Sequence, residues 1–492
     1  MLAYNINSNK IQQNIYIPKY YDPLLQKQLN QLSATHKLCS LGELIDEGTI
    51  SVQTGHEIGK MAYGTGNIPF IRTSDITNWE IKTIPKQGVS EEIYQLYADK
   101  EDVQVGDILL VRDGTYLIGT NCIITDLDIP MIFQSHILKF RVNNSKLINP
   151  YILFLAFNNQ LVQRQIRNLQ FTADIIDTLG SRYREIILPI PISKKLREEL
   201  STKVKDVLDL RVKHKAAIKQ MPLMIEKVLD TNSTKVFEEF FSSSIETIIH
   251  NLVQDTTTLE FGSFSAYSMN SNNIINSIFL PKYYDPSITK ELSDLKTNCK
   301  LFSIQELIDD NIIELSTGDE IGKMAYGTGS IPFVRTSDFS NWEIKADTKQ
   351  GISEEIYSQY AEKEDVQPED ILIVRDGTYL VGTSCMITEF DKKMLYCGGL
   401  IKIRVISKDL IDPYLLLGLL NSYIVKRQIR TKQFTRDVID TLGQRFKEVI
   451  IPIPVSQSIK ESISTTIRNI INDRVEARDN ITNLSQNLAS IS

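Results

Sequence analysis

The sequence predicts an α+β protein that contains two copies of one globular α/β module, each followed by a long helix, with the two helices pairing as an antiparallel coiled coil. Three observations support this fold class. The string IPFIRTSDITNWEIK at 68–82 returns as IPFVRTSDFSNWEIK at 331–345, an offset of 263 residues. Each copy contains short apolar runs broken by glycines, which is typical of strands. Each copy also ends in a PIP string followed by a heptad pattern of apolar residues.

The repeat defines the domain organisation. The offset of 263 also aligns Pro18 with Pro281, and Trp79 with Trp342, without a gap. A period of this length is that of a whole domain, not of a solenoid repeat. We therefore expect a first globular domain at 1–192, a first spacer helix at 193–230, a connecting segment at 231–264, a second globular domain at 265–455 and a second spacer helix at 456–492.

Composition limits the function. The net charge of −7 excludes a protein coated in basic residues, so contact with nucleic acid must come from local patches. The five cysteines have no ligand spacing, and we expect buried free thiols and no metal site. Without a long apolar run or an apolar start, the chain is expected to be cytoplasmic with no membrane contact.

Each module contains a polar loop tip next to apolar strands. Residues 107–119 are apolar on both sides of Asp113-Gly114, and Asp-Gly is a strong hairpin signal. The second copy keeps this pair as Asp376-Gly377. Either this is only a well-made turn, or the polar residues beside it take part in recognition, as loop tips on a rigid sheet often do. The loop Tyr63-Gly64-Thr65-Gly66 is expected to be a turn, because it lacks the Lys-Ser/Thr of a phosphate loop.

A basic helix follows Asn149-Pro150. Arg164 and Arg167 are three residues apart, so they share one helix face, as do Arg427 and Arg430 in the second copy. A solvated face and a phosphate-binding face both remain open at this point.

The long helices begin after Ser193 and Ser456, which are suitable N-caps. Their heptad rows need a partner helix, and pairing with each other is the simplest solution. Arg211, His214 and Arg474 interrupt the rows, and His214 is interpreted as a structural residue. The connecting segment contains VFEEFFSSSIETIIHNLV, which is expected to form an amphipathic helix that returns the chain to the second module.

Signatures of catalysis are missing. The sequence contains no GxxxxGK[ST], GxGxxG, HExxH or GxSxG string, and Asn149-Pro150-Tyr151 lacks the second proline of the methyltransferase [ND]PP[YF] motif. None of the five histidines recurs at an equivalent position of the second copy. We therefore expect no catalytic residues, no cofactor and no metal in this chain.

The ordered strings resemble a known family. The chain is similar to the specificity subunit of type I restriction-modification systems in the order of four strings that lead into a long helix, an arrangement that is given twice. In the first copy the strings are GHEIGKMAYGTGNIPFIRTSDI, GDILLVRDGTYLIGT, NPYILFLAFNNQLVQRQIR and IILPIPIS. The resemblance covers almost the whole chain. It implies that each module is a target recognition domain for half of a split site in double-stranded DNA. It also implies that methyltransferase (modification) subunits, and in some assemblies a translocating restriction subunit, dock on the chain and supply all catalysis.

Helix length supports a split site independently. A helix of about thirty residues is roughly 45 Å long, more than one turn of B-DNA at about 34–36 Å. Two readers at its ends would contact two half-sites with an unread gap between them. Because the modules are alike and the helices antiparallel, we expect similar, inverted half-sites.

The candidate DNA-binding residues carry the donors that base edges and phosphates require. They are Lys60, Arg72, Thr73, Ser74, Arg112, Thr115, Tyr116, Arg164 and Arg167 in the first copy, and Lys323, Arg335, Thr336, Ser337, Arg375, Thr378, Tyr379, Arg427 and Arg430 in the second. For Arg72 and Arg335 the alternative is a salt bridge to the aspartate three residues on. The copies differ at 134–136, Gln-Ser-His against Cys-Gly-Gly at 397–399, and at Ala173 against Arg436, and these positions are expected to tune the half-sites differently.

Two other classes of function remain. One is a protein-binding scaffold or inhibitor on the same helical rod, which would show no salt-dependent affinity for DNA. The other is a standalone DNA-modifying enzyme with duplicated active sites, which the missing motifs disfavour.

Overall fold

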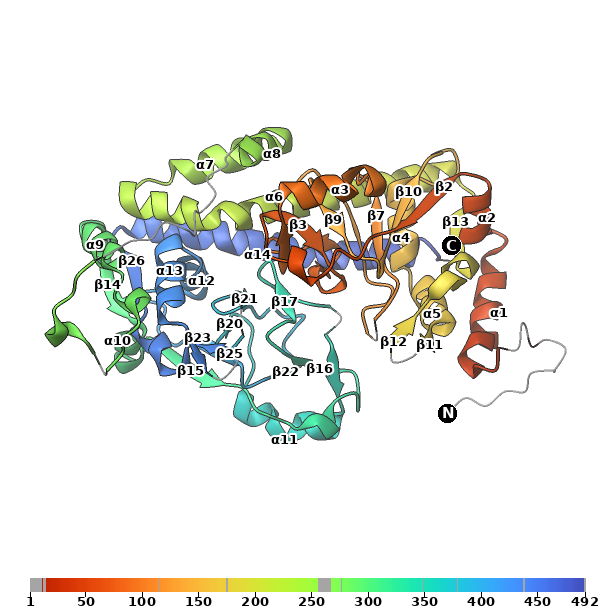
Figure 1. Cartoon of the computed structure of the whole chain (residues 1–492). Helices are drawn as coiled ribbons and strands as arrows, with labels where there is room; N and C mark the ends of the chain where they lie inside the picture. Colours follow the sequence, from red (N-terminus) through yellow and green to blue (C-terminus); the bar gives the residue numbers. More distant parts are fainter. Residues whose placement is uncertain are drawn as a thin grey trace. The chain divides into compact units, whose positions relative to one another are not determined.

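The computed structural model describes residues 11, 15–114, 116–173, 176–254, 267–275, 277–346, 348–377, 379–436 and 439–490 (Figure 1). The chain forms two compact units, which we call unit 1 (Met1–Arg211 and Glu476–Ser492) and unit 2 (Val212–Val475). Each unit therefore combines one globular module with one segment of each long helix. The mixture of helices and strands confirms the predicted fold class.

Unit 1 contains two main sheets. The four-stranded antiparallel sheet has the order β2 (Ile50–Thr54), β10 (Ile137–Val142), β7 (Ile108–Val111) and β8 (Asn121–Ile123). The second sheet has the order β6 (Gln87–Val89), β3 (Ile68–Ile71) and β9 (Ile132–Phe133), with β3 parallel to β9. Shorter pairs are β1 (His36–Ser40) with β13 (Ile187–Pro191), β4 (Ile76–Thr77) with β5 (Glu80–Ile81), and β11 (Phe171–Ala173) with β12 (Ile176–Thr178).

The helices of unit 1 begin at capping residues that the sequence supplies. Ser40 and Glu43 form a capping box for α2 (Leu41–Asp46), and Ser90 caps α3 (Glu91–Glu101). Asn149 caps α4 (Pro150–Asn158), whose first helical residue is proline. The remaining α-helices of the module are α1 (Pro23–Leu32) and α5 (Gln160–Leu169). Short 3₁₀ turns lie at Lys60–Ala62 (η3) and Thr73–Asp75 (η4).

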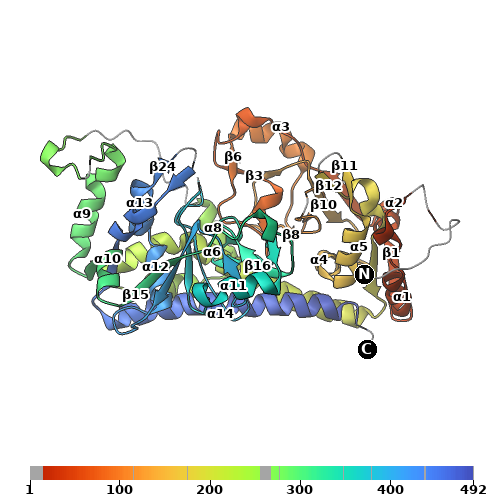
Figure 2. The same cartoon turned by 90° about the horizontal axis from the view of Figure 1, so that it is seen from below.

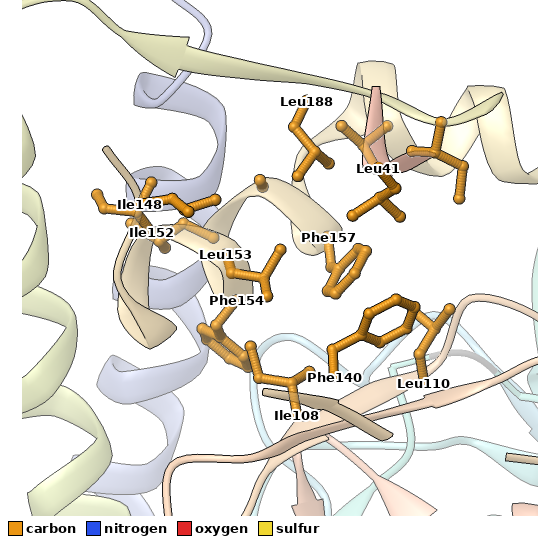
Figure 3. Close-up of a cluster of buried hydrophobic side chains, with 14 of the residues drawn as sticks. Leu41, Ile108, Leu110, Phe140, Ile148, Ile152, Leu153, Phe154, Phe157 and Leu188 are labelled. Atoms are coloured by element: carbon orange, nitrogen blue, oxygen red, sulfur yellow. The ribbon is translucent and has the colours of Figure 1, made fainter. Parts of the chain in front are cut away.

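The core of unit 1 surrounds α4, which is buried from Ile152 to Phe157. In Figure 3 the rings of Phe140 on β10 and Phe157 on α4 face one another, with centroids 5.1 Å apart. The same buried cluster includes Leu200 and Val204 of the long helix α6 (Lys194–Thr231) and Ile481 of the long helix α14 (Gln457–Asn487). The two long helices therefore share one apolar core with the module.

The ends of the two helices show that they run antiparallel. In unit 1, a ring nitrogen of His36 lies 2.6 Å from the carbonyl oxygen of Leu488, just beyond α14, and β1 pairs His36 with Pro191, just before α6. In unit 2, the Asn298 side chain donates to the carbonyl of Leu229, near the end of α6, at 3.0 Å. The carbonyl of Asn298 accepts from Val455, just before α14, at 2.9 Å. In each unit, one helix therefore ends where the other begins.

Unit 2 repeats the elements of unit 1. Its main sheets have the orders β15 (Ile313–Thr317), β23 (Leu400–Val405), β20 (Ile371–Val374), β21 (Ser384–Met386) and β19 (Gln350–Ile352), β16 (Ile331–Val334), β22 (Leu395–Tyr396). The short pairs are β14 (Cys299–Ser303) with β26 (Ile450–Pro454), β17 (Phe339–Ser340) with β18 (Glu343–Ile344), and β24 (Phe434–Arg436) with β25 (Ile439–Thr441). The helices are α9 (Pro286–Leu295), α10 (Ile304–Asp309), α11 (Glu354–Glu364), α12 (Pro413–Leu420) and α13 (Tyr423–Lys432).

One glycine allows close packing of α12 on α14 in unit 2 (Figure 2). A Cβ atom on Gly418 would lie 3.1 Å from Ile463 and 3.2 Å from Ile467. The offset of 263 residues places Leu155 at the equivalent position of α4, where its side chain is fully buried. The two copies therefore fill this position differently, with a large apolar side chain in unit 1 and a close helix contact in unit 2.

The connecting segment contains two helices where the sequence predicted one. They are α7 (Lys235–Ser242) and α8 (Ile245–Gln254), and the break falls at Ser243-Ser244. Phe237, Phe240 and Ile248 are buried, and Lys213 of α6 donates to the carbonyl of Phe241 at 2.8 Å. The segment therefore packs on α6 within unit 2.

The arginines that interrupt the heptads contact hairpins of the modules. Arg474 is fully buried, and its Nε lies 3.0 Å from Oε2 of Glu343 on β18. Arg211 makes the equivalent contact in unit 1, with its Nη2 3.4 Å from Oε1 of Glu80 on β5. Each long helix is therefore joined to a module by a buried ion pair. The third heptad-breaking residue, His214, lies 3.3 Å from Asp473 between the two helices.

The Asp113-Gly114 pair is not the two-residue hairpin turn that its sequence suggested. Strands β7 and β8 do pair, with Leu110 opposite Asn121, but the whole of 112–120 connects them. Asp113 instead forms an isolated bridge with Thr178, the last residue of β12. A tight hairpin does occur at β4–β5, whose turn residues Asn78 and Trp79 both have positive φ, 47° and 66°.

The described residues contain the buried thiols that were expected. The five cysteines are buried free thiols, and no cluster of metal ligands occurs among the residues that were placed. None of the described helices is long and apolar enough to cross a membrane.

Candidate nucleic-acid interface

The strand topology brings three separate segments to one edge of unit 1, and contacts of Glu57 with Ser135 and of Tyr63 with Arg72 join a fourth. β3 and β9 are parallel, so Arg72 and Gln134, which follow them, emerge side by side, and Gln134 N–H donates to the Ile71 carbonyl at 2.9 Å. β7 pairs antiparallel with β10, so Arg112 meets the residue before β10, and Arg112 N–H donates to the His136 carbonyl at 2.9 Å. We call the surface formed by 57–66, 72–75, 112–114 and 134–136 loop face 1. Its counterpart in unit 2, formed by 320–329, 335–338, 375–377 and 397–399, is loop face 2.

Glycines and one threonine fix the loop that carries Lys60. Gly59 and Gly64 both have a φ of 71°, a conformation that favours glycine. Gly66 packs so closely on the next strand that a Cβ atom would lie 2.5 Å from the Val89 carbonyl. Thr65 donates to the Ala62 carbonyl at 2.8 Å and closes the loop. The segment is therefore a rigid turn, as expected.

This turn exposes a lysine and a methionine in each copy. Lys60 and Lys323 are exposed, and Met61 and Met324 each have an exposed fraction of 92%. The sequence offered Lys60 as a candidate but gave no reason to select Met61, because burial cannot be read from a single apolar residue in a loop.

Arg72 lies across an aromatic pair. Its guanidinium is 6.0 Å from the centre of the Tyr63 ring, which stacks on Phe70 at 5.7 Å. The sequence left open a salt bridge between the side chains of Arg72 and Asp75. The contact that forms instead is a hydrogen bond of 3.0 Å from the backbone N–H of Arg72 to the Asp75 carboxylate. Arg335 and Asp338 repeat this backbone contact at 2.9 Å.

Asp75 supports the turn from inside. Its carboxylate is fully buried and also accepts from the Lys86 N–H at 3.1 Å. Burial raises the pKa of Asp75, although the backbone donors and Lys82 oppose that shift. The adjacent Thr73 and Ser74 remain half-buried at the surface, as do Thr336 and Ser337 in unit 2.

Arg112 and Arg375 are held by their neighbouring aspartates. Nε and Nη2 of Arg112 donate to Asp113 at 3.0 and 2.7 Å, and those of Arg375 donate to Asp376 at 2.9 and 2.7 Å. Burial raises the pKa of Asp113, but hydrogen bonds from Arg112, Thr178 and His136 outweigh burial and lower it overall. A guanidinium clamped on one edge keeps its other edge for a ligand.

The neighbouring loop residues are only partly described. Tyr116 is half-buried and packs against the apolar cluster that contains Ile71 and Leu109, and Tyr379 is also half-buried. Thr115 and Thr378 lie outside the described residues.

The helical arginines divide into two pairs. Arg164 binds Asp22 at 2.5 Å, and Arg427 binds Glu291 at 2.5 Å, so both tie the lead-in helices α1 and α9 to the module. Arg167 and Arg430 are exposed, and Arg430 also donates to Gln433 at 3.3 Å. Among the described residues, no ion pair joins Arg167 or Arg430 to a carboxylate. These two arginines can therefore bind a phosphate without losing such a partner.

One comparison identifies a family for part of the chain. Residues 310–484 match the family model described as type I restriction modification DNA specificity domain. The matched region runs from the end of α10 in unit 2 to near the end of α14. No curated protein matches the chain.

Solved structures of the same kind are similar to the chain over most of its length. An S subunit of a type I restriction-modification system from M. genitalium has 10% identity and a TM-score of 0.34, with 92% of this chain and 94% of that chain covered. The HsdS subunit from Thermoanaerobacter tengcongensis has 15% identity and a TM-score of 0.27, with 92% and 95% covered. TM-scores of this size do not define a shared arrangement, so the assignment rests on the family match and the internal repeat.

The matched region is similar to the DNA specificity domain of type I restriction-modification systems. Residues 47–221 repeat the motifs and elements of the matched region at a constant offset of 263. The family match over 310–484 therefore confirms the resemblance to type I restriction-modification specificity subunits that was seen in the sequence.

Proposed function

We propose that this chain is the non-catalytic, sequence-specific DNA-recognition subunit of a type I restriction-modification system. Each unit uses its loop face to bind one half of a bipartite site in double-stranded DNA. Methyltransferase subunits, and in assemblies that include one a translocating restriction subunit, bind the same chain and supply the chemistry. No cofactor is required by the chain itself.

The observation that carries the proposal is the duplicated loop face. Lys60, Arg72 and Arg112 come from three separate loops, yet hydrogen bonds and glycine packing hold their segments at one edge of the sheets. Unit 2 places Lys323, Arg335 and Arg375 in the same way. Cationic donors fixed on rigid elements suit phosphate contacts and bidentate recognition of guanine.

Helix length supports a bipartite site. The 31 residues of α14 give a helix of about 46 Å at about 1.5 Å per residue. One turn of B-DNA is about 34–36 Å long. Two readers joined by helices of this length would leave base pairs between the half-sites unread.

Salt dependence of DNA affinity tests the proposal. The chain, alone and with its methyltransferase subunits, should bind duplex DNA with an affinity that falls steeply as salt rises. The double variant Arg112→Ala/Arg375→Ala should lower the affinity by well over tenfold, because each loop face then lacks its clamped guanidinium.

A matched control removes one positive charge per unit elsewhere. Lys146 and Lys408 are exposed residues beyond the far ends of β10 and β23, so Lys146→Ala/Lys408→Ala should change affinity much less. Equal effects of the two double variants would mean that only total charge matters. Salt-independent binding or no binding would favour a protein scaffold instead.

A further inference from the structure

The two loop faces are identical in sequence except at one place. Residues 57–66 and 320–329 are the same, as are RTSD at 72–75 and 335–338, and RDG at 112–114 and 375–377. Only 134–136, Gln-Ser-His, differs from 397–399, Cys-Gly-Gly. Any difference in what the two loop faces bind must therefore begin at this triplet or at side chains it rearranges.

The triplet lies among the shared residues in both units. In unit 1, Gln134 bonds to the end of β3 and His136 to Arg112 through the backbone, at 2.9 Å each. In unit 2, Cys397 N–H donates to the Val334 carbonyl at 2.9 Å, and Arg375 N–H donates to the Gly399 carbonyl at 2.9 Å. The backbone framework is thus the same in both units while the side chains change.

In unit 1 the triplet occupies two carboxylates. Nδ1 of His136 lies 2.9 Å from Oδ2 of Asp113, and its Nε2 lies 4.0 Å from Oε1 of Glu57. Ser135 donates to the same oxygen of Glu57. The His136 side chain is 38% exposed, so its imidazole is the polar group that unit 1 presents between Asp113 and Glu57.

In the part of unit 2 that the structure describes, the glycines leave Glu320 without a partner, and Asp376 lacks the contact that His136 makes with Asp113. Glu320 is exposed, and none of the described residues of unit 2 makes a hydrogen bond or ion pair with its carboxylate. The side chain of Asp376 is 27% exposed, against 9% for Asp113. A Cβ atom on Gly399 would lie 3.0 Å from Thr336, so a side chain at this position would press on the RTSD turn.

This difference has a chemical consequence at DNA. A free carboxylate accepts hydrogen bonds, and in the major groove the donors are the amino groups of cytosine and adenine. A carboxylate that already accepts a hydrogen bond from a serine, as Glu57 does from Ser135, offers fewer acceptor positions. Loop face 2 is therefore suited to an amino group where loop face 1 presents an imidazole.

We propose that 134–136 and 397–399 are the specificity-determining residues that make the two half-sites differ. The half-site of unit 2 contains a base pair whose amino group faces Glu320, and the half-site of unit 1 does not require that amino group at the matching position. The target is then an inverted repeat that is broken at this position. The inference rests on the proposed function, which supplies DNA as the ligand.

A swap of the triplet tests the inference. The variant Gln134→Cys/Ser135→Gly/His136→Gly gives loop face 1 the sequence of loop face 2. Wild type and variant, each complexed with the methyltransferase subunits, are used to select duplexes from a randomised pool. The expected result is that one half-site of the variant changes to match the other, which is itself unchanged.

The control swap changes three other positions that differ between copies. Glu47→Asp/Gly48→Asn/Thr49→Ile lies at the opposite end of β2, and both Gly48 and Asn311 have positive φ, so the change is tolerated by the backbone. It should leave both half-sites as they are in wild type.

A second pair of variants does not depend on how the swap folds. Glu320→Gln removes the charge of an exposed acceptor, and it should relax the preference at one position of one half-site by at least about fivefold. Glu57→Gln, at the occupied equivalent, should have a smaller effect.

The outcomes separate the two proposals. If wild type enriches no sequence, the proposed function fails. If wild type enriches a perfect inverted repeat, or if the triplet swap leaves both half-sites unchanged while the duplexes are still selected, the proposed function stands and this inference is wrong.

Discussion

The buried pair between Arg474 and Glu343 gives the sharpest prediction about stability. Arg474 has no exposed surface, the Glu343 side chain is 5% exposed, and Nε and Nη2 of Arg474 lie 3.0 and 2.5 Å from the same carboxylate oxygen. Removing one partner of a buried pair leaves an uncompensated charge, which typically costs about 3–5 kcal/mol. We therefore expect Glu343→Ala to lower the free energy of unfolding of unit 2 by about 3 kcal/mol or more.

Replacing both partners should cost much less. Arg474→Met/Glu343→Leu removes both charges and fills the space with apolar atoms, a change that is often nearly neutral for buried pairs. The corresponding pair in unit 1, Arg211 with Glu80, is longer at 3.4 Å. We expect Glu80→Ala to cost less than Glu343→Ala.

The two tryptophans provide the assay. They are the only tryptophans in the chain, and Trp79 and Trp342 lie in the turns of the hairpins that carry the two glutamates. Trp79→Phe leaves a fluorescence signal from unit 2 alone during unfolding in guanidinium. A loss of less than about 1 kcal/mol in Glu343→Ala, or a double variant as unstable as the single one, would refute the idea that this pair holds the hairpin on the helix.

Three further outcomes follow from the same structure. Lys60→Ala/Lys323→Ala should reduce the slope of log affinity against log salt by about 2, roughly one for each phosphate that is no longer neutralised. An unchanged slope in a salt titration would mean that these lysines do not contact DNA. Gly66→Ala/Gly329→Ala places Cβ atoms 2.5 and 2.4 Å from the Val89 and Ile352 carbonyls, so this double variant should bind DNA more weakly and have a lower Tm. The control Gly48→Ala has open space around it and should keep a DNA affinity near that of wild type. Burial raises the pKa of Glu364 to about 7, so the folded unit 2 keeps a proton that the unfolded chain releases near pH 4.5. The free energy of unfolding should therefore fall by about 1 kcal/mol from about pH 6 to about pH 8. Unfolding followed by Trp342 fluorescence should show a flatter pH profile for Glu364→Gln.

The sequence predicted the repeat, the helix pairing and the presence of short strands, because these depend on local periodicity and on comparison of the two copies. The first half of IPFIRTSDITNWEIK forms β3, the middle strand of its sheet. The second half of that string was not recognised as a hairpin. Asn-Trp is an unusual pair for a turn in which both residues have positive φ, since Asn-Gly is preferred there.

The arginines in the heptads could not be interpreted from the sequence alone. Arg211 and Arg474 looked like interruptions of a coiled coil, because their partners, Glu80 and Glu343, lie 131 residues away in the chain. Only tertiary structure shows that each helix must carry a cation where a module docks on it.

The loop faces show the same limit. The sequence selected Lys60, Arg72 and Arg112 from composition and loop position, and the structure places all three segments at one edge of the sheets. It could not show that Arg164 and Arg427 are tied to Asp22 and Glu291, since a basic helix face looks the same whether it binds a carboxylate or a phosphate. The role of each candidate in DNA binding stays a prediction.

Selection of duplexes by the wild-type chain with its methyltransferase subunits tests the central claim most directly. We predict enrichment of two short half-sites in inverted orientation, separated by a gap of fixed length in which no base is preferred. A single continuous site, a variable gap, or no enriched sequence at all would contradict the claim that two loop faces on one helical spacer read a bipartite target.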